Sequence, residues 1–200
     1  YLNKILNNSN FDSFLYCSAT RVYSKSKETH ENTSLLTNSI DPRNLYTNLK
    51  ILGESICLSY NNPKIRIARL SNVTGNNFNS NLFLPSIIRD TVNKNNIELF
   101  TTLKSEKDYI LIDDVVQLLT KISLEGESQI YNVASGINLS NKEIVSQIQK
   151  ITKCKLSFSA DTFDYSFPKI DITRIINEFN FKPRSVLEHL EYLINCYQNK

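Results

Sequence analysis

Residues 14–23, FLYCSATRVY, begin as a short apolar run and continue as small polar residues followed by Val-Tyr. Consecutive apolar residues that end in a polar loop are typical of a buried parallel strand. Residues 24–39 follow with Glu28, Glu31 and several Ser and Thr, which indicates an excursion over the surface. We therefore expect a central strand that ends at the Ser and Thr of this stretch.

A helix is predicted after this excursion. Asp41 is suited to cap its first turn, and Pro42 is suited to the first helical position. Apolar residues then recur at intervals of four, three and four, which is the spacing of one helical face. They are Leu45, Leu49, Leu52 and Ile56. We expect this apolar stripe to face the core.

Strands and helices alternate along the rest of the chain. The predicted strands are residues 65–70, 97–100, 109–112, 130–133 and 156–158, with a loop at 72–81. The predicted helices are residues 82–92, a segment opened by Asp113-Asp114, a segment opened by the capping-box spacing of Ser140 and Glu143, and residues 172–179 and 186–197. This alternation favours a layered α/β fold with parallel strands.

Composition limits the partners. The chain has 200 residues and a formal net charge of +3, with 40% hydrophobic residues. That length suits one or two domains with a true core. So small a positive charge argues against nucleic acid as a partner. No stretch approaches the roughly 20 apolar residues of a membrane span, so we expect no membrane partner either.

Three residue types narrow the chemistry further. The four glycines are too widely spaced to form a Gly-rich phosphate loop. The four cysteines lack a CxxC spacing and no histidine accompanies them, so we predict no metal site and expect free thiols in a reducing compartment. The chain begins at Tyr1 and contains no Met, which we interpret as a fragment or a processed piece.

Tyr46 and Lys50 stand four residues apart on the predicted helix, so their side chains share one face. That face lies about 100° from the leucine stripe, at the rim of a cleft rather than in the core. Gly53 continues it and would allow a close approach by backbone or ligand. A lone tyrosine is a poor acid or base at neutral pH, but a neighbouring ammonium favours the phenolate. The pair therefore predicts a device for moving a proton.

Five blocks, in this order, carry a family resemblance. They are FLYCSATRVY (14–23), NLYTNLKILGE (44–54), RLSNVTG (69–75), KDYILIDDV (107–115) and YNVASG (131–136). In order and spacing they resemble the extended short-chain dehydrogenase/reductase family, specifically its NAD-dependent epimerase/dehydratase branch, which acts on nucleotide sugars.

The resemblance implies a fold: the C-terminal half of a doubly wound, Rossmann-type parallel sheet with a smaller mixed α/β substrate lobe. Residues 1–72 would form the remaining part of the dinucleotide-binding domain, to which some later elements return. Residues 73–200 would form mainly the substrate-binding lobe. Family members open with a strand, a GxxGxxG turn and a helix that hold the pyrophosphate, so about a hundred further residues are expected upstream of Tyr1.

The resemblance also implies catalytic roles. Tyr46 is the acid/base, and Lys50 holds the nicotinamide ribose. The family's third catalytic residue is a Ser or Thr, and its position here is Ala19, which has no hydroxyl. Ser18 and Thr20 are the candidate replacements, provided that the loop has left strand geometry, because adjacent strand residues point to opposite sides.

Binding roles follow from the same resemblance. The cofactor-binding candidates are Tyr46, Lys50, Cys17 and Ser71. The substrate-binding candidates are Thr20, Asn72 and Lys107, the last where the family often has an Arg on the substrate diphosphate. A turn-capping Asn72 and an exposed Lys107 are the plainer alternatives. Arg69 resembles an Arg that often precedes this loop, and Asp113 and Asp114 match an acidic pair that we interpret as structural.

The implied function is an NAD- or NADP-dependent epimerase or ketoreductase of a nucleotide-activated sugar, in polysaccharide biosynthesis and in the cytoplasm. Family dehydratases carry Asp-Glu where this chain has Thr20 and Arg21, which argues against a 4,6-dehydratase. Two alternatives stay open: a non-catalytic relative, favoured by Ala19, and a truncated chain without independent function. By analogy a homodimer is expected, and the 200 residues alone are expected to be inactive and poorly soluble.

Overall fold

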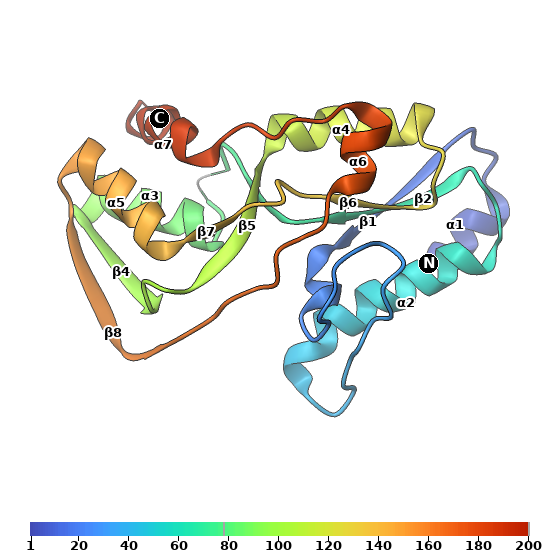
Figure 1. Cartoon of the computed structure of the whole chain (residues 1–200), viewed down its shortest axis with the longest axis horizontal. Coiled ribbons are helices and arrows are strands. Elements are labelled where there is room, and N and C mark those ends of the chain that lie inside the picture. Colours follow the sequence, from blue (N-terminus) through green and yellow to red (C-terminus); the bar gives the residue numbers. More distant parts are fainter. Residues whose placement is uncertain (78, 200) are drawn as a thin grey trace.

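The computed structural model describes residues 1–77 and 79–199, which form two lobes (Figure 1). The helices are α1 (Leu2–Asn8), α2 (Leu45–Ser59), α3 (Phe83–Lys94), α4 (Ile112–Glu125), α5 (Asn141–Thr152), α6 (Thr173–Phe179) and α7 (Val186–Gln198). The strands are β1 (Phe14–Ala19), β2 (Ile65–Leu70), β3 (Asn72–Thr74), β4 (Asn96–Thr101), β5 (Glu106–Leu111), β6 (Ile130–Val133), β7 (Asn138–Ser140) and β8 (Lys155–Phe163). Two 3₁₀ turns, η1 (Thr20–Tyr23) and η2 (Pro42–Asn44), precede α2.

The larger lobe is built on a parallel sheet with the strand order β1-β2-β6. Along β2 the side chains alternate between the two faces, as strand geometry requires. Ile65 and Ile67 pack against α1 and α2, whereas Ala68 packs in the cluster that α4 and α6 cover. Helices on both faces of a parallel sheet are the Rossmann-type arrangement, and they bury each strand on both sides.

The smaller lobe contains the strand pairs β3-β5, β5-β7 and β4-β8 together with α3, α5 and α7 (Figure 1). Its core is aliphatic, with Leu84, Leu99, Ile144 and Leu190 almost fully buried. The β5-β7 pair is antiparallel, while the other two pairs are parallel. A segment after β8 returns from this lobe to the larger one and leads into α6 (Figure 1).

The mixed α/β fold with parallel strands is confirmed, and each predicted strand and helix corresponds to one in the structure. The capping box is present: the Ser140 hydroxyl accepts from the Glu143 amide, and the Glu143 carboxylate accepts from the Ser140 amide. Strands β3 and β7 were not predicted, because three residues are too few to display an alternating pattern. Residue 78 of the predicted loop lies outside the described residues.

The predicted orientation of α2 is wrong in one respect. Its leucine stripe does not face the core: Leu45, Leu49 and Leu52 are 63%, 56% and 56% exposed. The helix instead buries the side that carries Glu54 and Cys57 against the β1-β2 sheet. An apolar stripe indicates only that one face of a helix is suited to burial. In this chain, a different face of α2 packs against the sheet.

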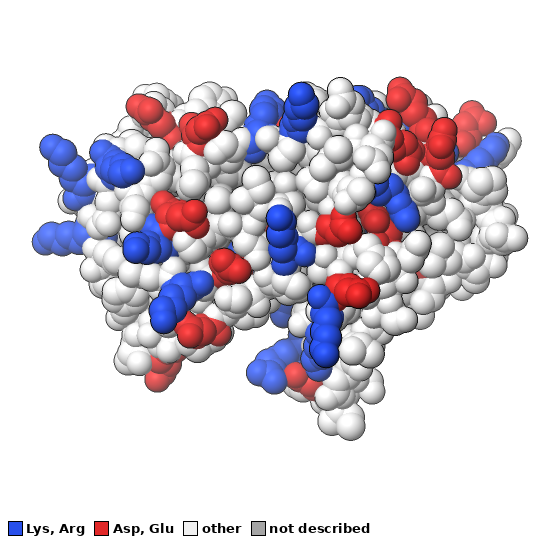
Figure 2. Space-filling view, in the orientation of Figure 1, with Lys and Arg blue, Asp and Glu red and all other residues white. Residues whose placement is uncertain are grey.

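Among the described residues, no helix is both long enough and apolar enough to cross a membrane. On the face drawn in Figure 2, acidic and basic side chains are interspersed, and the surface is hollowed at its lower edge between the two lobes.

Candidate active site

A cleft of about 670 Å³ lies at the carboxyl ends of β1 and β2, where α2 and the smaller lobe approach each other. This end of a parallel sheet is where open α/β proteins bind ligands. The lining includes every site residue predicted from the sequence: Cys17, Ser18, Thr20, Tyr46, Lys50, Ser71, Asn72 and Lys107. Residues far apart in the sequence therefore converge on one cavity.

Tyr46 and Lys50 face the cleft from α2. The Lys50 ammonium lies 5.6 Å from the centre of the Tyr46 ring, and it donates a 2.8 Å hydrogen bond to the main-chain carbonyl of Cys17. That bond links α2 to the end of β1. The Tyr46 side chain is about half exposed, so its hydroxyl is open to a ligand.

Cys17 contributes this carbonyl to the cleft. Burial raises the pKa of its thiol, although the Lys50 ammonium opposes the shift. The thiol therefore stays protonated at neutral pH, and the four cysteines are all free. Among the described residues no group of His, Cys, Asp or Glu is arranged to hold a metal ion.

The two hydroxyls beside Ala19 differ in their surroundings. Ser18 and Thr20 are both buried, at 3% and 5% exposed, but among the described residues only the Ser18 hydroxyl has a partner: it donates a 2.5 Å hydrogen bond to the Glu54 carboxylate. Thr20 begins the η1 turn, where the chain has left strand geometry, and it lines the cleft. Within residues 1–77 and 79–199, no group hydrogen-bonds to the Thr20 hydroxyl. Thr20, unlike Ser18, has a hydroxyl available to a ligand.

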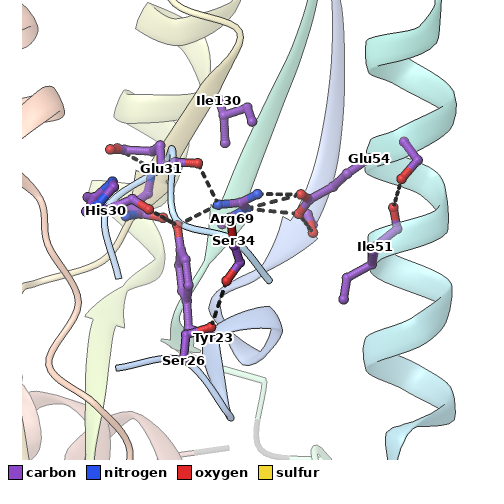
Figure 3. A network of polar contacts seen from close by, with 12 residues as sticks. Tyr23, Ser26, His30, Glu31, Ser34, Ile51, Glu54, Arg69 and Ile130 are labelled. Carbon is purple, nitrogen blue, oxygen red and sulfur yellow. Dashed lines mark hydrogen bonds and ion pairs between the residues drawn. The ribbon is translucent and has the colours of Figure 1, made fainter. Parts of the chain in front are cut away.

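A buried polar network (Figure 3) is joined to the cleft through Glu54, which accepts the hydroxyl of the lining residue Ser18. Arg69 and Glu54 form an ion pair with 2.6 Å between Nη2 and Oε2, and both side chains are 3% exposed. Arg69 also donates to the Tyr23 hydroxyl, which in turn donates to Asn132. Burial raises the pKa of Tyr23, with Arg69 opposing the shift. Arg69 is thus a buried residue that links β2 to α2 and to η1 through its side-chain bonds.

Asp108 on β5 organises the loop after β2. The Ser71 hydroxyl donates to its carboxylate, and the Asn72 side-chain amide donates to its carbonyl at 2.7 Å. Ser135 contributes both its amide and its hydroxyl to the same carboxylate. Burial raises the pKa of Asp108, and these hydrogen bonds oppose the shift. Both predicted loop residues are therefore held in place by Asp108, whose role no local sequence pattern indicates.

Lys107, the neighbour of Asp108, enters the cleft among aromatic rings. Its ammonium lies 4.9 Å from the ring centre of Tyr165 and 5.7 Å from that of Phe83. Burial lowers the pKa of the Lys107 amine, and the Arg21 charge lowers it further. Lys107 is only partly exposed, so the alternative of a freely solvated lysine is wrong.

The sequence analysis missed two aromatic lining residues, Tyr165 and Phe167. They lie on the segment after β8, which main-chain hydrogen bonds tie to Glu106 on β5. This segment has no periodic pattern, and only the tertiary path of the chain brings it to the cleft.

Two further expectations are settled by packing. Gly53 does not face the cleft: a Cβ there would come within 2.2 Å of the Tyr16 hydroxyl, so the close approach is by a side chain and not by a ligand. Asp114 is buried and accepts hydrogen bonds from the main chain and side chain of Arg184, in agreement with a structural role.

A family model and several known proteins match this chain. The model of the NAD dependent epimerase/dehydratase family matches residues 2–134. A dTDP-4-dehydro-6-deoxyglucose reductase from Escherichia coli is 27% identical over 140 residues, which are 68% of this chain and 42% of the relative. Across the curated relatives, the matched part is 38–46% of their length.

Solved structures share the fold. RMD from Pseudomonas aeruginosa, complexed with NADPH, has a TM-score of 0.81 at 18% identity, covering 100% of this chain and 70% of that one. UDP-glucuronic acid 4-epimerase from Bacillus cereus, in complex with UDP-glucuronic acid and NAD, has a TM-score of 0.78 at 22% identity, covering 100% and 67%.

Proposed function

This chain belongs to the NAD dependent epimerase/dehydratase family, and on that premise we propose that it acts on a nucleotide-activated sugar as an NAD(P)-dependent epimerase or ketoreductase. The observation that carries the proposal is the Tyr46–Lys50 pair: the Lys50 ammonium lies 5.6 Å from the centre of the Tyr46 ring, in the cleft that Thr20 also lines. The structural neighbours contain NAD or NADPH, which supports a nicotinamide cofactor.

In this proposal Tyr46 exchanges a proton with a sugar hydroxyl or carbonyl. The ammonium of Lys50 lies 5.6 Å from the centre of the Tyr46 ring, so both side chains can contact the same part of a ligand. Thr20 donates a hydrogen bond to the reacting oxygen, which Ala19 cannot do because it has no hydroxyl. A bound nicotinamide would supply or accept the hydride.

The residues present suit the nicotinamide end of the cofactor. Lys50 and Tyr46 would hold the ribose hydroxyls, and Cys17 and Ser71 line the same part of the cleft. The four glycines of these 200 residues form no Gly-rich turn of the kind that cradles a pyrophosphate. We therefore assign the nicotinamide end, and not the pyrophosphate, to this part of the protein.

Epimerisation or reduction fits the cleft better than dehydration. Eliminating water from a sugar needs an acid and a base beside the ring, commonly carboxyl groups. No Asp or Glu is found among the described residues that line the cleft. A second candidate is a non-catalytic relative that binds the same ligands, and the observation in its favour is Ala19 at the wall of the cleft.

The proposal includes a homodimer formed through α2. Leu45, Leu49 and Leu52 are each more than half exposed and form one stripe along this helix. Water contact with such a stripe is unfavourable, and isologous packing against a second copy would remove it. Dimers through the helix that bears the Tyr-Lys pair are what the family resemblance implies.

The test is to express the protein from its complete reading frame, because the 200 residues alone are expected to be inactive, to supply it with nucleotide sugars and NAD or NADPH, and to follow the sugar by ¹H NMR. Following the sugar matters because an internal epimerase produces no net NADH. We expect a changed sugar, formed at least about a hundredfold more slowly by Tyr46→Phe. Tyr192→Phe, at an exposed position on α7, is the matched control. An unchanged rate in Tyr46→Phe, or no product with any cofactor, would contradict the proposal.

A further inference from the structure

The charged side chains among the described residues that line the cleft are all positive. Its lining contains three cationic side chains, Arg21, Lys50 and Lys107, and within the described chain none of the lining residues is an Asp or a Glu. By contrast, Arg69, a buried cation of the larger lobe, has an acidic partner in Glu54. A cavity with only one sign of charge concentrates ligands of the opposite sign.

The three cations are not equivalent. Lys50 is engaged by the Cys17 carbonyl and by the ring of Tyr46. Lys107 contacts aromatic rings. For the Arg21 guanidinium, no ion pair or hydrogen bond is formed with any residue in 1–77 or 79–199. Five N–H donors are therefore left for a ligand at the wall of the cleft.

Arg21 and Lys107 also repel each other, since the charge of Arg21 disfavours protonation of Lys107. They come from different parts of the fold, η1 in the larger lobe and β5 in the smaller one. Two like charges turned toward one cavity without an acid between them are unfavourable in the empty protein. An anion bound there would relieve this repulsion.

The position of Arg21 indicates which part of a substrate it meets. It directly follows Thr20 in η1, and Thr20 is the residue that the proposed function assigns to the reacting oxygen of the sugar. Lys107 stands on β5, where a diphosphate is the anion expected from the family resemblance. Arg21 is thus attached at the sugar end of the cleft. A planar guanidinium matches a carboxylate with two parallel hydrogen bonds.

We propose that Arg21 is a specificity-determining residue that binds a carboxylate on the sugar ring, so that the preferred substrate is a nucleotide-linked uronic acid. This inference rests on the proposed function and names its substrate class. Lys107 holds the diphosphate of the same molecule. A neutral hexose would leave the guanidinium of Arg21 without a partner in the cleft.

The test compares matched ligands by isothermal titration calorimetry, with no cofactor and no turnover. Each pair shares its nucleotide and differs only at C6: UDP-glucuronate against UDP-glucose, with the corresponding dTDP and GDP pairs. For at least one nucleotide we expect the wild-type chain to bind the uronate about tenfold or more tightly than the hexose. Arg21→Gln should bring that ratio to within about threefold of one.

Arg43→Gln is the matched control, because Arg43 is an exposed arginine outside the cleft. It should keep the wild-type ratio. Arg21 is exposed and unpaired within the described residues, so we expect Arg21→Gln to keep the wild-type melting temperature. A ratio near one in the wild type, a ratio that Arg21→Gln leaves unchanged, or no binding of any pair would overturn the proposal.

Inorganic pyrophosphate separates the two anionic groups of such a substrate. We expect Lys107→Gln to weaken pyrophosphate binding about tenfold and Arg21→Gln to weaken it less than about threefold. The reverse order would mean that Arg21 binds the diphosphate, and the uronate assignment would fall. Sugar discrimination without turnover would keep this inference and remove the proposed function, whereas turnover of neutral sugars regardless of Arg21 would do the opposite.

Discussion

The guanidinium of Arg69 and the carboxylate of Glu54 meet inside the protein, with 2.6 Å between Nη2 and Oε2 and 3% exposure of each side chain. Arg69 lies on β2 and Glu54 on α2, two turns after Tyr46. Glu54 also accepts the hydroxyl of Ser18 at the end of β1. One carboxylate therefore sets the distance between the helix that carries the Tyr46–Lys50 pair and the two strands whose ends form the cleft.

Replacing Glu54 by Gln should lower the free energy of unfolding. It leaves the Arg69 charge buried without its counter-ion, which typically costs about 3–5 kcal/mol. We expect a loss of this size in the free energy of unfolding, measured by urea denaturation at neutral pH. Asp41→Asn is the control, because the Asp41–Arg43 pair lies at the surface with Arg43 exposed, and it should stay close to wild type. A Glu54→Gln protein as stable as wild type would mean that the pair is dispensable.

This network also marks a limit of reasoning from the sequence. Tyr46 and Lys50 could be predicted because four-residue spacing fixes their common helical face. The ion pair could not, because Arg69 and Glu54 lie on different elements and no local pattern relates them. Tyr165 and Phe167 could not be predicted as lining residues for the same reason. Main-chain hydrogen bonds to β5, and no local pattern, bring their segment to the cleft.

More of the fold than of the site could be predicted from the sequence, with one error in the buried face of α2. Buried strands such as Ile65–Leu70 are short segments rich in Ile and Leu, and helices such as Asn141–Thr152 carry their own capping signal, so both were predictable. The stripe of Leu45, Leu49 and Leu52 gave α2 correctly but its buried face incorrectly. Periodicity shows which face is apolar, and tertiary packing decides what covers it.

The exposed leucine stripe of α2 predicts that the protein forms a dimer. Leu49→Asp places a charge at the middle of the proposed α2 contact, where an apolar face would otherwise be buried against a second copy. We expect the wild-type chain to sediment as a dimer and Leu49→Asp as a monomer of unchanged helical content. Leu124→Asp is the control, because Leu124 is 73% exposed on α4. A wild-type monomer, or a Leu49→Asp dimer, would remove α2 as the interface.

The capping box should make stability depend on acid pH. Hydrogen bonds from the Ser140 side chain and amide hold the pKa of Glu143 below its ordinary 4.5. A depressed pKa in the folded state stabilises the protein above the ordinary pKa, and this contribution is lost as pH falls through the folded value. Glu143→Gln can still cap but cannot titrate.

We therefore expect the difference in unfolding free energy between wild type and Glu143→Gln to shrink from neutral pH toward pH 3. Because solvent screens this exposed carboxylate, the change should be about 0.5 kcal/mol. Urea titrations from pH 7 to pH 3 measure it, with Glu98→Gln, an exposed change on β4, as the control. A constant difference across that range would contradict the role of the charge.

The interaction between Lys107 and Arg21 predicts how the stability of the protein changes at alkaline pH. Burial and the charge of Arg21 hold the pKa of the Lys107 amine below its ordinary 10.5. Removing that charge in Arg21→Gln should raise the Lys107 pKa, as followed by NMR of ¹³Cε-labelled lysine. Between the depressed and ordinary values the unfolded state binds more protons, so wild-type stability should rise with pH there, and less so in Arg21→Gln. Arg43→Gln should change neither quantity, and an unmoved Lys107 signal in Arg21→Gln would show that the two charges do not interact.

We expect Thr20, and not Ser18, to supply the hydroxyl that Ala19 lacks. Thr20→Val keeps the shape of the side chain but removes the only hydroxyl next to Ala19 that is not already bonded within the described residues. We expect it to lower kcat by about tenfold to a hundredfold, with an unchanged melting temperature.

Ser18→Ala should behave in the opposite way. It removes a hydrogen bond to buried Glu54, which should cost about 1–3 kcal/mol of stability with a smaller effect on kcat. Ala19→Ser adds a hydroxyl at the cleft wall and should raise kcat and partly rescue Thr20→Val. The same ¹H NMR assay of the sugar measures all three variants. If Ser18→Ala loses turnover while Thr20→Val retains it, the hydroxyl that contacts the sugar is that of Ser18, and the Glu54 bond must open when the substrate binds.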